Sequence, residues 1–287
     1  MENYRMPRIS ILMSIYNETI EQIRESIDSV LRQTYSDFEF VIILDNPDYS
    51  EAIDLLSDYK KFDSRISYYV NEANIGLALS MNVAASKAEG IYYARMDADD
   101  IAEPTRLERE IAVLNTGNYD FVFCDFSFID ENGNVMEKDT YIFNDNQIPK
   151  LLPFRNIIHH PTVMFTADIF NVVGGYRNYV CAQDYDLWLR MLNANCRFHM
   201  VKEKLMKYRI RNNSTTGSKR VKQINTLRYV KKLYKNRPSM SGYNYDDYLM
   251  FLKENEQNNV SPQEKMIRKA ASFFNSVRIH LILIFVR

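Results

Sequence analysis

The chain has 287 residues, of which 46% are hydrophobic and 25% charged, and its formal net charge at pH 7 is −1. This composition is that of a globular protein, and the length suffices for one large α/β domain or one domain with an appendage. The near-zero net charge gives no support for nucleic acid as a partner. The three cysteines, Cys124, Cys181 and Cys196, lack CxxC spacing. This argues against a zinc knuckle or a disulfide framework and favours a reducing, cytoplasmic compartment.

Apolar runs and helical repeats alternate over the first hundred residues. Buried strands are expected at residues 8–16, 38–45 and 66–70 and from Ile91 onward, with apolar residues at helical spacing between them. This β-α-β-α-β-α-β order is typical of a parallel sheet with helices on both faces. Tyr16, Asp45 and Asp97 stand at the carboxyl ends of expected strands, which is where such sheets bind ligands.

The stretch Ile91–Asp100 ends in three carboxylates within four positions: Asp97, Asp99 and Asp100. Like charges this close repel, so a folded chain keeps them beside something positive. On an extended strand end Asp97 and Asp99 can point the same way, and their hard oxygens suit Mg²⁺ or Mn²⁺ with positions left for a phosphate ligand. The chain has no GxGxxG or P-loop motif, so a metal is the more obvious device for holding a phosphorylated ligand. The alternative is a solvated turn in which Asp99 or Asp100 caps the next helix.

The pattern after Pro104 is less regular, as expected where parallel winding gives way to a mixed sheet edge. A helix follows Pro104, and the dipeptide Asn132-Gly133 is a strong hairpin signal. Strands are expected at residues 121–128, 162–165, 197–201 and 206–210, and a helix is expected at 184–195.

The segment 218–237 carries eight lysines and arginines and no acidic residue. Ile224, Leu227, Val230 and Leu233 or Tyr234 fit one face of a helix, so a basic helix packed on the domain is one interpretation. The other is a surface for anionic lipid headgroups, extended by the apolar stretch 279–287, which is too short to span a bilayer. We expect membrane association through both segments.

Several short motifs, in this order and spacing, resemble glycosyltransferase family 2, whose members use nucleotide sugars and have the GT-A fold. They are Ser10–Glu18, Ser29–Tyr35, Asn74–Leu77, Arg95–Asp100, His160-Pro161, Gly174–Tyr176 and Gln183–Trp188. The resemblance implies an α/β fold with a Rossmann-like, mostly parallel sheet, helices on both faces and a mixed edge. It implies a catalytic domain over 1–212, with a donor half at about 1–100 and an acceptor half at about 101–212. Residues 213–287 would form a basic helical extension.

On the donor side the resemblance implies that Asp97 and Asp99 form a DxD motif. The motif would bind the Mn²⁺ or Mg²⁺ that bridges the donor diphosphate and acts as a Lewis acid on the leaving group. Tyr16 would stack on the base and Asp45 would hydrogen-bond it, although Leu44–Pro47 keeps only the second acid of the family's usual Asp-Asp pair. The other residues implied to bind the nucleotide sugar are Ser14, Glu18, Asn74, Gly76 and Arg95.

On the acceptor side Asp184 matches the family's catalytic base, here in a Gln-Asp rather than a Glu-Asp pair. One carboxylate within reach of an acceptor hydroxyl is what this chemistry needs. The alternative for Asp184 is a helix N-cap, and Asp186 is a second candidate base. His160 would line the acceptor side or occupy a turn, while Trp188 is either a sugar platform or, as we favour, a core residue. Arg209 and Arg211 either close over the diphosphate or lie in a solvated loop.

The resemblance therefore implies an inverting glycosyltransferase. It would move a hexose or N-acetylhexosamine from a nucleoside-diphosphate sugar, with UDP expected, to a growing bacterial surface glycan such as O-antigen, capsule or exopolysaccharide. An undecaprenyl-diphosphate-linked saccharide at the inner face of the plasma membrane would suit as acceptor, and nucleic acid would not. The alternatives are a nucleotidyltransferase, which lacks its glycine- and arginine-rich loop here, and an inactive glycan-binding or scaffold subunit, against which Asp97, Asp99 and Asp184 argue.

Overall fold

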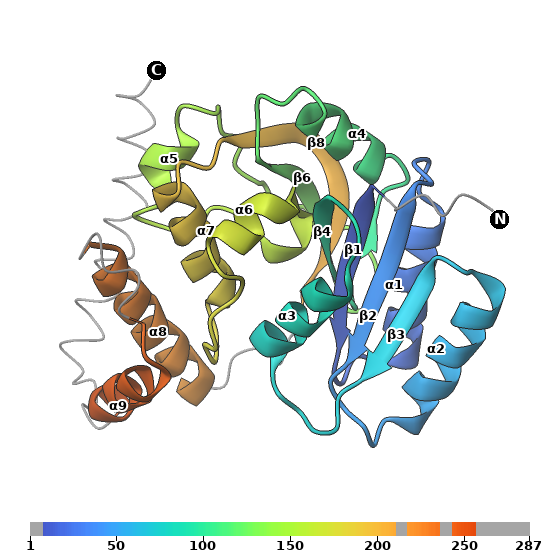
Figure 1. Cartoon of the computed structure of the whole chain (residues 1–287), viewed down its shortest axis with the longest axis horizontal. Coiled ribbons are helices and arrows are strands. Elements are labelled where there is room, and N and C mark those ends of the chain that lie inside the picture. The colour runs from blue at the N-terminus through green and yellow to red at the C-terminus, as the bar shows by residue number, and fades with distance from the viewer. Residues whose placement is uncertain (1–7, 211–216, 236–242, 257–287) are drawn as a thin grey trace.

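A computed structural model describes residues 8–210, 217–235 and 243–256. Its centre is one mixed sheet of eight strands in the order β3-β2-β1-β4-β7-β6-β8-β5 (Figure 1). The predicted fold class is confirmed: a parallel half built from the first hundred residues continues into a mixed edge.

The parallel half comprises β1 (Ile9–Ile15), β2 (Phe38–Leu44), β3 (Ile66–Val70) and β4 (Tyr92–Asp97). Its helices are α1 (Ile20–Leu31), α2 (Ser50–Phe62) and α3 (Leu77–Lys87). Helix α1 begins at a capping box, in which Thr19 and Gln22 satisfy each other's backbone N–H groups. Strands β1, β2 and β4 are buried on both faces, as a continuous apolar run predicts for a parallel sheet.

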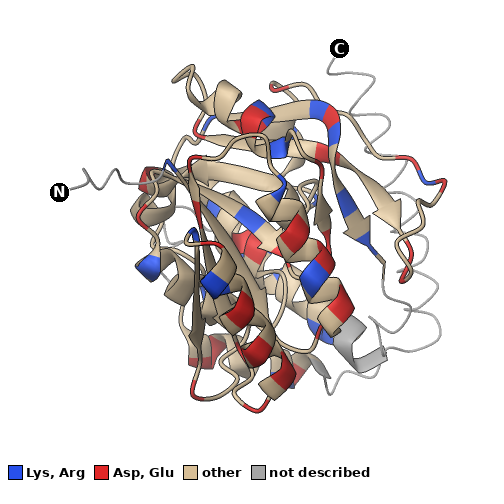
Figure 2. Cartoon of the chain, turned by 90° about the vertical axis from the view of Figure 1, so that its right-hand side faces the viewer, with Lys and Arg blue, Asp and Glu red and all other residues tan. Residues whose placement is uncertain are grey.

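The two faces of the sheet carry separate apolar cores. Helices α1, α2 and α4 (Arg106–Leu114) cover one face, and α3 and the later helices cover the other. On the side of the molecule that carries α1 and α2, acidic and basic residues are interspersed (Figure 2), in keeping with a net charge near zero.

The second half completes the sheet with β5 (Ile101–Ala102), β6 (Phe121–Ile129), β7 (Val163–Thr166) and β8 (Phe198–Arg209). Around these strands lie α5 (Ile148–Leu151), the 3-10 helix η1 (His160–Thr162), α6 (Ala167–Val172) and α7 (Gln183–Asn193).

The two strands expected at 197–201 and 206–210 are in fact one, β8. Three charged residues, Lys202, Glu203 and Lys204, lie between the two expected strands, so the sequence pattern indicates a turn there. In the structure all three are exposed. The structure accommodates them in an irregularity of the β6–β8 pairing near Cys124 and Asp125. Strand β5 has only two residues and carries no periodic signal that could have predicted it.

The basic segment forms α8 (Gly217–Lys235), and α9 (Tyr245–Glu256) follows it. Helix α8 lies beside α7, and α9 lies beside α8 (Figure 1). Val230, Tyr234 and Tyr248 are buried in the same apolar cluster as Trp188. For the described residues of this segment, the interpretation as a basic helix packed on the domain is therefore confirmed, and membrane association stays a prediction. Among the described residues no helix is long and apolar enough to cross a membrane. Arg211 and the stretch 279–287 lie outside the described residues.

Candidate active site

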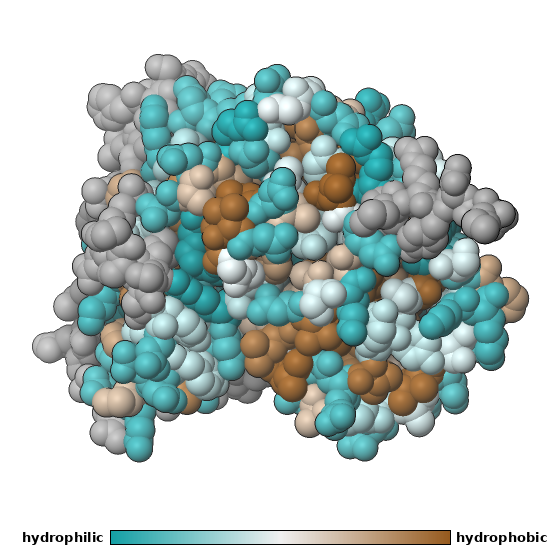
Figure 3. Space-filling view, viewed as in Figure 1, coloured by the Kyte–Doolittle hydropathy of each residue, from teal (hydrophilic) through white to brown (hydrophobic). Residues whose placement is uncertain are grey.

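A cavity of about 590 Å³, which we call the central cavity, brings together residues that are far apart in the sequence. Its walls are the 74–78 loop, Asp97, His160, the 178–184 segment, and one residue from each of α8 and α9. Ile75 and Leu77 at its rim are exposed, and Figure 3 shows an apolar patch over α3. The structure thus places the expected donor-side carboxylate Asp97 and the expected base Asp184 around one space.

Asp97 is the last residue of β4, and its side chain is 26% exposed. The guanidinium of Arg95 forms an ion pair with its Oδ1 atom and also donates to the Leu12 carbonyl, at 3.3 Å. Arg95 itself is buried. The guanidinium charge of Arg95 therefore stabilises the Asp97 carboxylate from inside the sheet. Arg95 does not line the central cavity.

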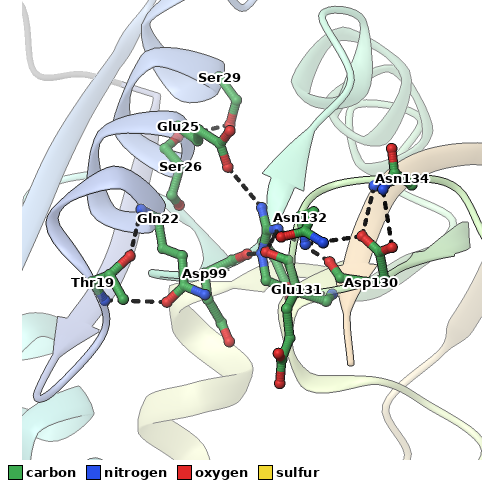
Figure 4. Close-up of polar contacts among 12 residues, drawn as sticks. Thr19, Gln22, Glu25, Ser26, Ser29, Asp99, Asp130, Glu131, Asn132 and Asn134 are labelled. Atoms are coloured by element: carbon green, nitrogen blue, oxygen red, sulfur yellow. Dashed lines mark hydrogen bonds and ion pairs between the residues drawn. The ribbon is translucent and has the colours of Figure 1, made fainter. Parts of the chain in front are cut away.

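Beyond Asp97 the chain turns through Asp99 and Asp100, and Arg209 fixes this turn through hydrogen bonds to both residues. Figure 4 shows the surroundings of Asp99. The backbone N–H of Arg209 donates to Asp100 Oδ1 at 2.8 Å, and its Nε donates to the Asp99 carbonyl at 2.7 Å. The rest of the guanidinium binds Glu25 and the backbone carbonyls of Asp130 and Glu131. Because Arg209 is buried, it is neither a clamp over a diphosphate nor part of a solvated loop. It ties the acidic turn to α1 and to the end of β6.

Asp100 is buried, and its pKa is raised well above the ordinary value, first by burial and then by the charges of Asp97 and Asp99. The prediction that Asp99 or Asp100 caps the next helix is wrong, since the turn leads into β5 and Thr105 is the N-cap of α4. The acidic cluster therefore has no capping role that would explain it.

Asp97 and Asp99 are both partly accessible and supply hard carboxylate oxygens. Among the described residues no group of three or more His, Cys, Asp or Glu side chains is arranged to hold a metal ion. This donor set fits a Mg²⁺ or Mn²⁺ ion whose other ligands come from substrate phosphates, and it does not fit a closed, all-protein site.

Asp184 lies in the first turn of α7 and is half-buried. Its Oδ2 atom accepts a hydrogen bond of 2.8 Å from Asn156 Nδ2. Burial raises the pKa of Asp184, and the charge of Asp97 adds to this; the N–H groups of the helix start and Asn156 act in the opposite direction. The N-cap of α7 is Ala182, so the prediction that Asp184 serves as the cap is wrong. Ala182 has a left-handed backbone (φ 56°), which costs an alanine about 1 kcal/mol.

His160 starts η1 and is buried at the wall of the central cavity. Its Nε2 atom is 2.7 Å from the hydroxyl of Tyr176. Burial, followed by the charge of Arg95, lowers the pKa of His160 well below its usual value. The imidazole is therefore neutral near pH 7 and is a hydrogen-bonding group rather than a cation.

Two residues expected on the acceptor side do not line the central cavity. Trp188 is fully buried and packs edge-on against Phe121, so the prediction of a core residue is confirmed and the sugar platform is wrong. Asp186 is also fully buried, and its carboxylate lies between Arg177 and Arg190, at 3.3 and 2.7 Å. Such a doubly paired carboxylate is a structural ion-pair centre, so the structure gives it no route to an acceptor hydroxyl.

Asp45 is buried, and both of its oxygens are bound by the chain itself. Oδ1 accepts from Asn71 Nδ2 and the Ile75 N–H, at 2.7 and 2.9 Å, and Oδ2 accepts from the Gly76 N–H at 2.8 Å. Asp45 therefore holds this loop in place, and its contact with a nucleotide base stays a prediction. Gly76 has φ 86°, a conformation that strains any residue with a side chain, and Asn74 Oδ1 also accepts from its N–H.

Tyr16 is 45% exposed just beyond β1, where its face is accessible to a ligand. Glu18 Oε2 accepts a hydrogen bond of 2.8 Å from the Tyr16 N–H, so Glu18 shapes the strand end. Ser14, also in β1, is half-buried and lies in register with Asp97 on β4. These three residues flank Asp97 at the carboxyl edge of the sheet but do not line the central cavity.

The sequence patterns missed Asn156, the 178–182 segment, Gln223 and Tyr245. Gln223 lies within the basic segment 218–237 but is neither one of its basic residues nor one of its apolar residues, and the others belong to no periodic run or charge cluster that could have marked them. They come together only because α7, α8 and α9 pack against one another.

Comparisons with known proteins show which family this chain is similar to. The Glycosyl transferase family 2 profile matches residues 10–174. The O-antigen biosynthesis glycosyltransferase WbnJ of Escherichia coli is 39% identical over 213 residues, which are 73% of this chain and 82% of WbnJ. An uncharacterized glycosyltransferase of Methanocaldococcus jannaschii is 37% identical over 221 residues, 76% of each chain.

Among solved structures, Staphylococcus aureus TarS 1-349 in complex with UDP-GlcNAc superposes with a TM-score of 0.65 at 15% identity, covering 86% of this chain and 71% of TarS 1-349. This chain covers 44% of a longer TarS chain. The profile match, the identity to WbnJ and the shared GT-A fold together lead to one conclusion: the chain belongs to glycosyltransferase family 2 and is a glycosyltransferase.

Proposed function

We propose that this enzyme transfers a hexose or N-acetylhexosamine, with inversion, from a uridine diphosphate sugar to a saccharide hydroxyl. The observation that carries the proposal is that Asp97 and Asp184 line the same cavity. In-line displacement needs the leaving diphosphate and the acceptor oxygen on opposite faces of the sugar ring, so two separate carboxylates around one space suit it.

The chain's own residues have distinct parts in this reaction. Tyr16, at the carboxyl edge of β1, would stack on the base, and the 74–78 loop held by Asp45 would border the donor. Asp184 would take the proton from the acceptor hydroxyl as its oxygen attacks the anomeric carbon. His160, being neutral, would hydrogen-bond a sugar hydroxyl without attracting the diphosphate.

Asp97 and Asp99 would hold the divalent cation, Mn²⁺ or Mg²⁺. When bound, this ion supplies positive charge that stabilises the departing nucleoside diphosphate. The geometry of the acidic turn is maintained by Arg95 and Arg209, whose contacts are internal to the chain.

We also propose that the acceptor is a growing surface glycan on a lipid carrier at the inner face of the plasma membrane. The similarity to an O-antigen biosynthesis enzyme supports a surface glycan, and the TarS complex with UDP-GlcNAc supports UDP in the donor. Because the chain belongs to glycosyltransferase family 2, the alternative function as a nucleotidyltransferase is excluded.

The function is tested by thermal shift with UDP-glucose, UDP-galactose, UDP-GlcNAc and UDP-GalNAc, each with Mn²⁺, followed by an assay of UDP release. A donor held at ~100 times its dissociation constant stabilises the fold by ~2.7 kcal/mol, enough to raise the melting temperature by several degrees. We expect one UDP sugar to do so and to release UDP. A wild type that neither binds nor hydrolyses any of them would contradict the proposal.

Membrane association is expected to depend on exposed lysines of α8. Lys231 does not qualify, because its Nζ donates to the Phe154 carbonyl at 2.6 Å and burial lowers its pKa. Lys232 and Lys235 are exposed. Changing both to glutamate should weaken sedimentation with phosphatidylserine vesicles, by ~1 kcal/mol or more per residue at low salt. The matched control is the same reversal at Lys60 and Lys61 of α2; equal binding of both variants would refute the prediction.

A further inference from the structure

The C-terminal helices α8 and α9 supply part of the wall of the central cavity. Gln223, from α8, and Tyr245, the first residue of α9, both line it. Gln223 is exposed, and Tyr245 is 38% exposed. With residues 178–183 they form a continuous stretch of the lining, which we call the α8–α9 wall and which leads directly to Asp184.

The α8–α9 wall is built as a fixed surface. The hydroxyl of Tyr248 accepts a hydrogen bond from the Val180 N–H at 3.3 Å and lies 2.8 Å from Thr226 Oγ1. The Tyr243 hydroxyl donates to the Asn178 carbonyl at 2.7 Å. The Tyr179 ring packs against the rings of Tyr243 and Tyr248, each with centroids 4.9 Å apart. Both C-terminal helices thus hold the loop that precedes the helix of the base.

The charged side chains of the cavity lining are the carboxylates of Asp97 and Asp184, and the α8–α9 wall includes neither of them. None of its members carries a charge: residues 178–183 are Asn, Tyr, Val, Cys, Ala and Gln, joined by Gln223 and Tyr245. A diphosphate is held by cations, so this wall does not suit the charged part of a donor. An aromatic ring beside amide side chains suits a neutral sugar, whose C–H face packs on the ring while its hydroxyls bond to the amides.

We propose that the α8–α9 wall is the subsite for the acceptor saccharide, with Tyr245 packing on its ring and Gln223 binding its hydroxyls. The inference rests on the proposed function and adds the C-terminal helices to the active site. A saccharide against this wall lies next to Asp184, whose carboxylate would receive the proton of the attacking hydroxyl. The uncharged wall also predicts that the terminal unit of the acceptor is a neutral sugar.

The test measures transfer to the α and β p-nitrophenyl glycosides of glucose, galactose, GlcNAc and GalNAc, with the donor found by thermal shift. We expect Tyr245→Ala and Gln223→Ala to raise KM for the accepted glycoside by about tenfold or more. Donor KM and the slow hydrolysis of donor by water should stay within about twofold of wild type, because the donor side is untouched. Tyr245→Phe should retain wild-type KM, since it keeps the ring.

The control is Lys253→Ala, an exposed change on α9 that does not line the cavity. Unchanged glycoside KM in both alanine variants would overturn the subsite, as would an equal loss of donor binding. So would a wild type that hydrolyses its donor but transfers to none of these glycosides. A wild type that hydrolyses no UDP sugar would instead overturn the proposed function, and this inference with it.

Discussion

Replacing Asp99 by alanine is expected to abolish the Mn²⁺-dependent part of UDP binding and to reduce sugar transfer by about 10²–10³-fold or more. Asp99 is the cleaner of the two DxD positions to change. Asp97→Ala would leave the buried guanidinium of Arg95 without its carboxylate partner and would confound activity with folding. The Arg209 contact, by contrast, uses the backbone carbonyl of Asp99, which alanine retains.

Isothermal titration of UDP with and without Mn²⁺ measures this effect, and the melting temperature reports the fold. Asp168→Ala is the matched control, because Asp168 is an exposed carboxylate on α6 that does not line the central cavity. Transfer that continues undiminished in EDTA would exclude the metal role of the DxD motif.

The sequence predicts the parallel half of the fold well because its signals are local. Continuous apolar runs mark strands that are buried on both faces, and the carboxyl edge of those strands holds Tyr16 and Asp97 as expected. Asp184 could also be placed at the start of a helix from local pattern alone. What the pattern could not say is that Asp97 and Asp184 line the same cavity, since this depends on how the second half folds over the first.

The residues whose contacts the sequence does not predict share one feature: their roles depend on distant partners. Asp45 holds the 71–76 loop through both of its carboxylate oxygens, a role that its local sequence does not indicate. Arg209 is expected either to close over a diphosphate or to lie in a solvated loop, but its partners lie in α1 and after β4 and β6. Asp186 reads as a second acid beside Asp184, and only the fold shows that Arg177 and Arg190 enclose it.

The pH dependence of turnover should report the environment of Asp184. A general base works in its ionised form, so kcat/KM falls as pH drops through its pKa. Because burial raises this pKa, the acidic limb of the profile should lie above the ordinary aspartate value of about 4. His160 cannot supply that limb near neutral pH, since its pKa is shifted well downward.

Replacing Asp184 by asparagine is expected to reduce transfer by ~10²–10⁴-fold while donor affinity stays near wild type. Asparagine keeps the size of the side chain and can still present an oxygen to Asn156 Nδ2. Stability should not fall. A carboxyl with a raised folded-state pKa favours folding only at low pH and loses that contribution as pH rises through this pKa, so the neutral amide should match or exceed wild-type stability at pH 7.

Asp186→Asn provides the contrasting result, because it removes charge from a buried carboxylate that two arginines share. Its main effect should be a loss of ~3 kcal/mol of stability, with turnover per folded molecule largely kept. Turnover, UDP binding and melting temperature measured on both variants separate the two roles. If Asp184→Asn transfers sugar at the wild-type rate, Asp184 is not the base; if Asp186→Asn keeps its melting temperature but loses turnover, the base is Asp186.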